Sequence, residues 1–501
     1  YEIGVRLVGS EMCIRDSPFS LNDVSGNTRV LILDDEKGIY FGFINAQSSE
    51  SIRANQHQRD QGARPPVGDQ VGVTLDFDND GKTAYRFSVN AGNSINDGTV
   101  INENEQNLDW DGDWLSATSI SDIGWYAEIF IPWAITSMKS QKGDERTIGF
   151  CFYRMMIAEY KVSATCKGSP YVNKFLSVFD VMNFKKYEVS QLDFFPYVTL
   201  SDDTATKEND TKVGAEVFWK IDSSKQLNAT FNPDFGQAES DDVVINFSAQ
   251  ETFYSEKRAF FNENQSLFNI NNYDRYTVMN TRRIGSAPSY KCLEEENIDE
   301  CENSKKNYSD IDYALRYSQK TGKTELGFFA ARETDESFSV GRNFYALRSR
   351  TDLGNKTLGY MLTHVDDSFN NKTASVSVID YVNVKSDQLT YFTDLLFSEK
   401  DDDSRFGYRS QFNYQPSNFS YISGSILYFD ENFQLNDFGY LRRADWIHVG
   451  LGGGFKQVDF AKDSSINQID FGFDFNYDAD TKGNTNPIKI DQQNIIVFKD
   501  T

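Results

Sequence analysis

Acidic residues at alternate positions come closest to a recognisable chemical motif in this sequence. Asp76, Asp78 and Asp80, followed by a glycine, match the first half of a calcium-binding EF-hand loop. The twelfth position of such a loop requires a bidentate glutamate, and Phe87 stands there, so the match fails. Residues 81–83 end like a phosphate-binding loop but lack its first glycine. We therefore interpret this stretch as the turn of a β-hairpin.

Recognised catalytic motifs are missing. The chain has only three histidines, His57, His364 and His448, and their wide separation disfavours histidine catalysis and histidine metal sites. HExxH and GxSxG do not occur, and residues 450–455 (GLGGGF) fail the dinucleotide fingerprint because Phe455 replaces its last glycine. A glycosidase needs two carboxylates facing across a cleft, and 75 acidic residues offer no basis for choosing a pair.

The cysteines suggest disulfides and therefore an oxidising compartment. Cys292 and Cys301 flank a polar loop between strands, where we predict a disulfide. Cys151 and Cys166 form a second candidate pair, although Cys151 lies in an apolar run. Free thiols are the alternative. Neither pair has CxxC spacing, which disfavours zinc.

Charge and composition exclude several classes of protein. The 50 basic and 75 acidic residues give a net charge of −25, which argues against a nucleic-acid partner. Aromatic residues reach 14%, which argues against disorder. No run of apolar residues is long enough for a transmembrane helix, whereas a transmembrane strand needs only about 9–11 alternating residues.

Residues 18–186 have the pattern of a β-sandwich, with short strands, turn signals and little helical periodicity. We expect two strands within residues 29–46, a hairpin over residues 70–90, and a strand over residues 124–135 that ends near Pro132.

Residues 187–501 form a long series of amphipathic strands. In the segment 406–414, Phe and Tyr alternate with Gly, Arg, Gln and Asn, and the segment 469–478 alternates in the same way. An aromatic face opposed to a polar face is typical of an antiparallel transmembrane β-barrel. We expect further strands near 212–220, 225–231, 311–318, 323–332, 343–351, 356–365, 373–383, 388–397, 417–429 and 445–457. A soluble solenoid or sandwich is the alternative.

Residues 232–268 interrupt this series with proline, many charges and several phenylalanines. Such charge cannot face lipid, where Lys or Arg at the midplane costs about 2–4 kcal/mol. We predict that the segment lines or constricts the barrel lumen. Its charged residues Glu251, Glu256, Lys257 and Arg258 would form a cluster there, with acids pairing with Lys257 and Arg258. An external loop is the alternative.

The hairpin at 70–90, WDGDWLSAT (110–118) and DIGWYAEIFIPW (122–133) resemble family 9 carbohydrate-binding modules. The resemblance implies that Trp110, Trp114 and Trp125 are candidates for stacking on sugar rings, the first two because their acidic surroundings suggest exposure. Asp111 and Asp113 are weak candidates for Ca²⁺, with an exposed acidic turn as the alternative. Trp125 and Trp133 fall in phase with apolar neighbours, which favours a core position.

Residues 227–270 and NTRRIGSAP (280–288) resemble a bacterial outer-membrane barrel family classed as a domain of unknown function. DFGYLRRAD (437–445) is similar to a later segment of that family. In the family the barrel follows a module like those of carbohydrate-binding family 9, and this chain has the same order. The resemblance implies a location in the bacterial outer membrane, with the N-terminal domain in the periplasm.

Residues 1–17 resemble translated sequencing-adapter contamination, and both ends of the chain look cut. We therefore expect an all-β protein with a sandwich at 18–186 and a barrel at 187–501, truncated at both ends. Its expected partners are membrane lipid and a glycan ligand, and its expected role is ligand binding or passage. A glycan hydrolase or its accessory protein, and a structural envelope protein, are the alternatives. No cofactor is expected apart from the weak calcium candidate.

Overall fold

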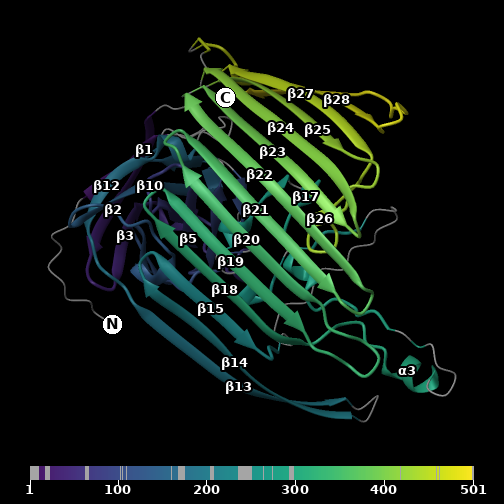
Figure 1. Cartoon of the computed structure of the whole chain (residues 1–501). Coiled ribbons are helices and arrows are strands. Elements are labelled where there is room, and N and C mark those ends of the chain that lie inside the picture. Colours follow the sequence, from purple (N-terminus) through teal and green to yellow (C-terminus); the bar gives the residue numbers. More distant parts are fainter. Residues whose placement is uncertain are drawn as a thin grey trace. The chain divides into compact units, whose positions relative to one another are not determined.

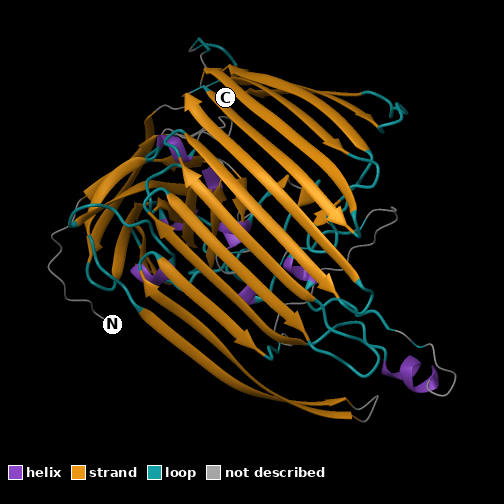
Figure 2. Cartoon of the chain, in the orientation of Figure 1, coloured by secondary structure: helices purple, strands orange, loops and turns teal. Residues whose placement is uncertain are grey.

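β-Strands make up most of this computed structural model (Figure 2). The structure describes residues 11–501 apart from 17–22, 62–66, 102, 104, 109, 160, 167–174, 204–207, 235–250, 255, 263–264, 273–274, 291, 293–297, 387, 418, 458–459, 462 and 499–501. The chain divides into unit 1 (Tyr1–Val189) and unit 2 (Ser190–Thr501), each with a core of its own. The division falls close to the boundary expected after residue 186.

Unit 1 is built on one antiparallel sheet. Its strands pair in the order β7-β6-β5-β4-β10-β11-β1-β2-β3-β9-β8, and β12 pairs with β10. The strands are β1 (Glu11–Asp16), β2 (Asp23–Asp34), β3 (Gly38–Ala46), β4 (Gln70–Asp76), β5 (Thr83–Asn90), β6 (Ile95–Ile101), β7 (Glu105–Asn107), β8 (Leu115–Ser121), β9 (Gly124–Pro132), β10 (Glu145–Met156), β11 (Lys161–Ala164) and β12 (Asp180–Lys185).

This sheet folds over so that its two halves share a core. Phe41 and Phe43 of β3 contact Phe152 of β10, with ring centroids 5.4 and 5.9 Å apart, although β3 and β10 are not neighbours in the sheet. Alternate residues of both halves point into this core because side chains of a strand alternate between its faces. The predicted antiparallel β-structure is confirmed for unit 1.

Residues 11–16, within the stretch that resembles adapter sequence, form a strand in the structure. They make up β1, which pairs with β2 and β11 and so links the two halves of the sheet. The interpretation of residues 1–17 as adapter-derived sequence stays a prediction, which this pairing does not test. Residues 1–10 and Ser17 lie outside the described residues.

Unit 2 is a 14-stranded antiparallel sheet in which each strand pairs with the next one along the chain (Figure 1). The strands are β13 (Gln191–Asp203), β14 (Glu208–Asp222), β15 (Lys225–Phe231), β18 (Ile311–Thr321), β19 (Thr324–Glu333), β20 (Asn343–Asp352), β21 (Lys356–Asp367), β22 (Lys372–Ser386), β23 (Leu389–Lys400), β24 (Asp403–Ser417), β25 (Ser420–Phe429), β27 (Trp446–Gln457), β28 (Ile466–Ala479) and β29 (Lys489–Phe498).

Two long connections fold onto one face of this sheet. The chain between β15 and β18 carries α1 (Ala259–Asn262), α2 (Gln265–Phe268), β16 (Asn271–Asn272), β17 (Tyr276–Thr277), a 3₁₀ turn (Thr281–Arg283) and α3 (Ile298–Ser304). The chain between β25 and β27 carries β26 (Tyr440–Leu441), which pairs with β17. We call the described residues of 251–285 and 430–445 the inner layer, and the sheet face that they cover the inner face.

The inner layer is packed against the sheet through aromatic side chains. Phe261 contacts Phe329 of β19 at a centroid distance of 6.2 Å, and Phe438 contacts Phe344 of β20 at 5.2 Å. Gly327 on β19 is required here, because a Cβ at that position would lie 2.6 Å from the Phe268 ring. The covered face therefore forms a continuous core with the inner layer.

The 14-stranded sheet is open. β13 and β29 are its two edges, and no pairing joins them among the described strands. The structure thus confirms a large antiparallel sheet, whereas the closed barrel expected from the sequence is not formed. Among the described residues, no helix combines the length and apolar character needed to cross a membrane.

Candidate functional site

The three tryptophans proposed for sugar stacking lie in the core of unit 1. Trp110, Trp114 and Trp125 are 7%, 5% and 0% exposed. Trp110 and Trp114 contact the Phe87 ring at 5.8 and 5.6 Å, so neither indole offers a free face. The expectation that Trp110 or Trp114 would be exposed is wrong, whereas the core position predicted for Trp125 is confirmed.

Gly112 allows the Trp110 ring to be buried although the neighbouring residues are acidic. The Trp110 ring folds back over Gly112, where a Cβ would come within 2.5 Å of it. The Trp114 indole N–H donates to Asp97 Oδ2 at 3.1 Å, which satisfies its only polar group. The two indoles therefore point inward from a turn whose acids, Asp111 and Asp113, are exposed.

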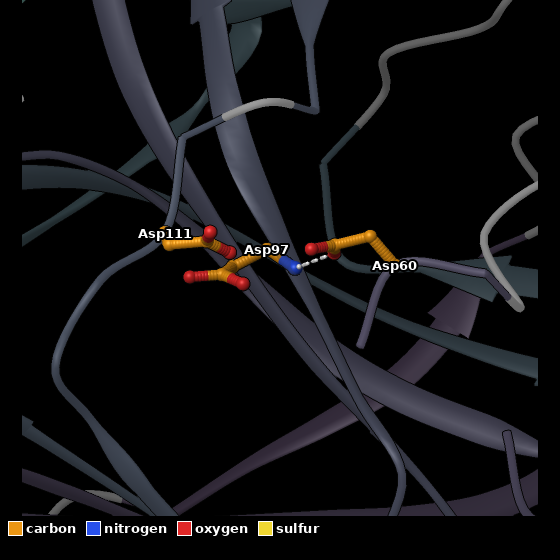
Figure 3. Close-up of side chains that lie close together, drawn as sticks. All are labelled: Asp60, Asp97 and Asp111. Carbon is orange, nitrogen blue, oxygen red and sulfur yellow. Dashed lines mark hydrogen bonds between the residues drawn. The ribbon is translucent and has the colours of Figure 1, made fainter. Parts of the chain in front are cut away.

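Asp111 lies in an acidic cluster with Asp60 and Asp97 (Figure 3). Asp97 comes from β6, and the other two residues come from loops on either side of it. Asp60 Oδ1 accepts a hydrogen bond from the Asp97 backbone N–H at 2.8 Å. Burial raises the pKa of Asp60 to about 7, and the charges of Asp97 and Asp111 add to that effect.

Arg59 occupies the position between these carboxylates. Its Nε lies 2.8 Å from Asp97 Oδ1 and 2.8 Å from Asp111 Oδ1, and its Nη2 donates to the Gly112 carbonyl at 2.7 Å. A hard cation would need those carboxylate oxygens as ligands. The residues present therefore fit a guanidinium-centred ion-pair network rather than Ca²⁺. Asp113 is exposed and is not in the cluster.

The EF-hand-like stretch is a hairpin turn, as predicted. Asp76 accepts hydrogen bonds from the backbone N–H groups of Asp78, Asp80 and Gly81 at 3.2, 2.9 and 2.7 Å. Burial raises the pKa of Asp76 to about 8, and the nearby Asp80 carboxylate adds to that effect. The acid thus closes the turn between β4 and β5.

Both cysteine pairs are disulfide-bonded in the structure. Cys151 of β10 joins Cys166, which follows β11, and their Cα atoms lie 5.2 Å apart. Cys292 joins Cys301 of α3, with a Cα separation of 5.6 Å. Each bond closes a short loop within one unit.

The charge cluster at 251–258 ties two parts of the inner layer together. Glu251 accepts two hydrogen bonds from Arg283, both 2.8 Å. Glu256 pairs with Arg258 at 2.7 Å and accepts from the Thr281 hydroxyl at 2.6 Å. Lys257 is half-buried. The acid–base pairing predicted for Arg258 is therefore present, with Glu256 as its partner.

The inner face carries buried charged residues that the sequence analysis did not identify one by one. Arg316 donates to the carbonyls of Phe260 and Phe261 at 3.3 and 3.1 Å, which anchors α1. Arg348 pairs with Asp380 and donates to the Leu267 carbonyl at 3.0 Å.

A second buried pair lies beside it. Arg409 pairs with Asp394 at 3.0 Å, and the Tyr276 hydroxyl also donates to Asp394. Asp380 and Asp394 face each other on neighbouring strands, so each carboxylate has its own arginine. Strand alternation could have placed these side chains inward, but not matched them.

Comparison with known proteins concerns unit 2. Residues 189–391 match the family model described as a domain of unknown function (DUF5916). No curated protein gives a significant match to the chain. The matched region begins at the boundary between the units and runs through β22, and it includes the described parts of the inner layer up to residue 285. The chain thus carries a DUF5916 domain at residues 189–391.

Proposed function

We propose that unit 2 is embedded in the bacterial outer membrane as the wall of a β-barrel whose lumen is filled by the inner layer. Unit 1 is then a periplasmic module, and the protein captures a ligand or controls its passage, with glycans as the candidate class. The outer face of the sheet is the observation that carries this proposal.

That face exposes large apolar side chains along nearly every strand. On the edge strand β13, this face carries four exposed apolar side chains, Leu192, Phe194, Val198 and Leu200, with exposed fractions of 60–77%. Phe195 points to the other face of β13 and is 54% exposed. The central strands continue the apolar face with Tyr313, Leu326, Phe328, Tyr345, Leu347, Leu358, Tyr360, Ile379, Phe397, Tyr414, Ile422, Ile426, Val449, Leu451 and Phe455. A water-soluble protein rarely leaves so large an apolar patch uncovered, whereas lipid would cover it.

The inner face has the opposite character. Arg316, Arg348, Asp380, Asp394 and Arg409 are at most 7% exposed and are paired with one another or with backbone carbonyls. Charges on the lipid-facing side would be costly, and a filled lumen supplies partners for them. The packing of α1 against β18 and β19 favours gated passage or capture over an open pore.

The test uses the full-length protein expressed with an export signal. We expect it in the outer-membrane fraction, with different gel migration before and after boiling. In liposomes with brominated lipid, emission from Trp219, which is 39% exposed on β14, should be quenched. Trp219→Phe should remove most of this quenching, whereas Trp446→Phe, a buried position, should not. Recovery as a soluble protein without detergent would contradict the proposal.

The proposal that the ligand is a glycan can be tested separately from membrane insertion. Because Trp110, Trp114 and Trp125 are buried, sugar binding by unit 1 would have to use other groups. A glycan array probed with the full-length protein in detergent tests this point. Absence of binding, with membrane insertion intact, would favour the structural alternative, and hydrolysis of a bound glycan would favour the enzymatic one.

A further inference from the structure

A serine, a histidine and an aspartate meet on the inner face of the C-terminal strands. Leu427 of β25 belongs to the buried core and pairs with His448 of β27, which in turn pairs with Asp478 of β28. His448 therefore lies on the inner face, and Ser425, two residues before Leu427, shares that face. None of the sequence motifs considered above marks this combination.

The aspartate fixes the histidine. Asp478 Oδ1 lies 3.0 Å from His448 Nδ1, and it also accepts a hydrogen bond from the Trp446 indole at 2.7 Å. A carboxylate can only accept, so the proton of the neutral imidazole stays on Nδ1 and Nε2 carries the lone pair. His448 is 3% exposed, and its Nε2 has no hydrogen-bond partner among the described residues.

Gly450 brings the serine to that free nitrogen. Ser425 pairs with Gly450 and Gly450 pairs with Asn476, so three strands meet at this point. A Cβ at Gly450 would lie 2.7 Å from Ser425 Oγ, 3.2 Å from His448 Nε2 and 3.5 Å from Asn476 Oδ1. Any larger residue would separate these groups. Ser425 Oγ and His448 Nε2 both border this glycine but are not hydrogen-bonded to each other in the structure, and such catalytic contacts are often long before substrate binds.

We propose that Ser425, His448 and Asp478 form an acyl-transfer site that hydrolyses carboxylic esters. Ser425 is the nucleophile, His448 is the general base and acid, and Asp478 is a positioning residue. Asn476 supplies an amide near the reacting carbonyl. A Cβ at Gly452 would lie 3.1 Å from Ser423 Oγ, with Asp474 rather than a histidine beside it, so Ser423 lies outside the proposed site.

The reaction balances with water as the only co-reactant. Ser425 Oγ attacks the ester carbonyl while its proton passes to His448 Nε2. The carbon–oxygen bond to the alcohol breaks, and the departing oxygen takes that proton. Water then attacks the acyl-serine, giving its proton to Nε2, and the proton returns to Ser425 Oγ as the acid is released.

The experiment treats the full chain in detergent with an alkyl fluorophosphonate and, separately, with p-nitrophenyl butyrate. We expect covalent labelling that peptide mapping assigns to Ser425. Ser425→Ala should lose it, and Ser423→Ala, the matched serine over Gly452, should keep it. His448→Gln should slow ester hydrolysis by about 10²–10⁴-fold. Near-ultraviolet circular dichroism should report the same fold in each variant.

The role of Asp478 needs its own control. Asp478→Asn should slow hydrolysis and shift its pH profile, because the imidazole loses the partner that fixes its tautomer. Asp491→Asn, at an exposed acid of β29 that pairs with Lys489, is the control and should leave that profile unchanged. Absence of labelling in the unaltered protein, labelling that survives in Ser425→Ala, or equal loss in Ser423→Ala would overturn the proposal. None of these outcomes depends on membrane insertion, so they are separable from the proposed function.

Discussion

Arg59 sets the electrostatic balance of the acidic cluster in unit 1. One guanidinium lies among Asp60, Asp97 and Asp111, so the cluster holds more negative charge than it can neutralise. The Asp97 carboxylate accepts hydrogen bonds from the Arg59 guanidinium, the Gly112 backbone N–H and the Trp114 indole. Burial is the main reason why the pKa of Asp60 rises to about 7, and the excess negative charge adds to that effect.

This shift predicts a pH dependence of stability for unit 1. The pKa of Asp60 is about 7 in the folded protein and 3.8 as a model value, so between these pH values the folded state binds a proton that the unfolded chain releases. The contribution of Asp60 to stability therefore falls as the pH rises from about 4 to 7 and is constant above that range. Asp60→Asn should reduce the difference between urea midpoints at pH 5 and pH 8.

Tryptophan emission can follow the urea unfolding of unit 1, because this unit contains four of the six tryptophans: Trp110, Trp114, Trp125 and Trp133. Asp113→Asn, at an exposed acid outside the cluster, is the control and should leave the difference between the two pH values unchanged. An equal difference in wild type and Asp60→Asn would contradict the assignment to Asp60.

The buried indoles predict a loss of stability rather than a loss of binding. Trp110→Ala removes a side chain packed against Tyr85 and Phe87 and should cost about 3–5 kcal/mol of unfolding free energy. Trp114→Phe should cost about 1 kcal/mol, because Asp97 keeps its other donors. Urea unfolding measures both. Variants that remain fully stable but no longer bind a glycan would restore the sugar-stacking interpretation.

At the scale of the elements, alternation predicted most strands of unit 2 but missed β13. The edge strand contains Pro196, which lacks a backbone N–H, and adjacent Phe194 and Phe195, which break the alternation. Proline is tolerated at a sheet edge because one side of an edge strand has no partner strand that would need its N–H. Local patterns therefore gave the strand positions, but not which strand forms the edge.

Long-range partners were beyond the reach of the sequence. Asp60 and Asp111 lie close together because β6 lies between their loops, and Ser425 Oγ and His448 Nε2 can both border Gly450 because it carries no side chain. Scarce histidines argued against histidine catalysis, yet one histidine on the right strand is enough for the proposed site. Strand register, which a single sequence does not fix, decides each of these pairings.

The pair Arg348–Asp380 predicts strong coupling between β20 and β22. Gly359 on the strand between them leaves room for both side chains, since a Cβ there would lie 2.5 Å from Arg348 Nη1. Arg348→Met leaves Asp380 buried without its cation and should cost about 3–5 kcal/mol. The double variant Arg348→Met/Asp380→Leu should recover most of that loss.

Urea midpoints from near-ultraviolet circular dichroism complete this double-mutant cycle. The exposed pair Arg405–Asp403 is the control, and its coupling should stay below about 1 kcal/mol. A double variant no more stable than Arg348→Met alone would show that the cost comes from lost packing rather than from an unpaired charge.

At the scale of the whole chain, the two units bury their cores in different ways. Unit 1 folds one sheet onto itself, whereas unit 2 covers one face of its sheet with the inner layer and leaves the other face apolar and exposed. An inner layer held by buried aromatic rings and by hydrogen bonds from arginines should stay in place while the protein is at rest. If the sheet encloses a lumen, as proposed, this layer decides whether ions pass.

The resulting prediction concerns conductance in planar bilayers. The unaltered protein should show little current, because Phe260 and Phe261 are fully buried against the sheet. Phe260→Ala/Phe261→Ala combined with Arg316→Met removes that packing and the donor to the carbonyls of both residues, and should produce frequent openings. Phe253→Ala, at a 42% exposed position of the same layer, is the control and should remain closed. A triple variant that still inserts but stays as silent as the unaltered protein would place α1 outside any conducting path, because weakening its contacts could not then change the flow of ions.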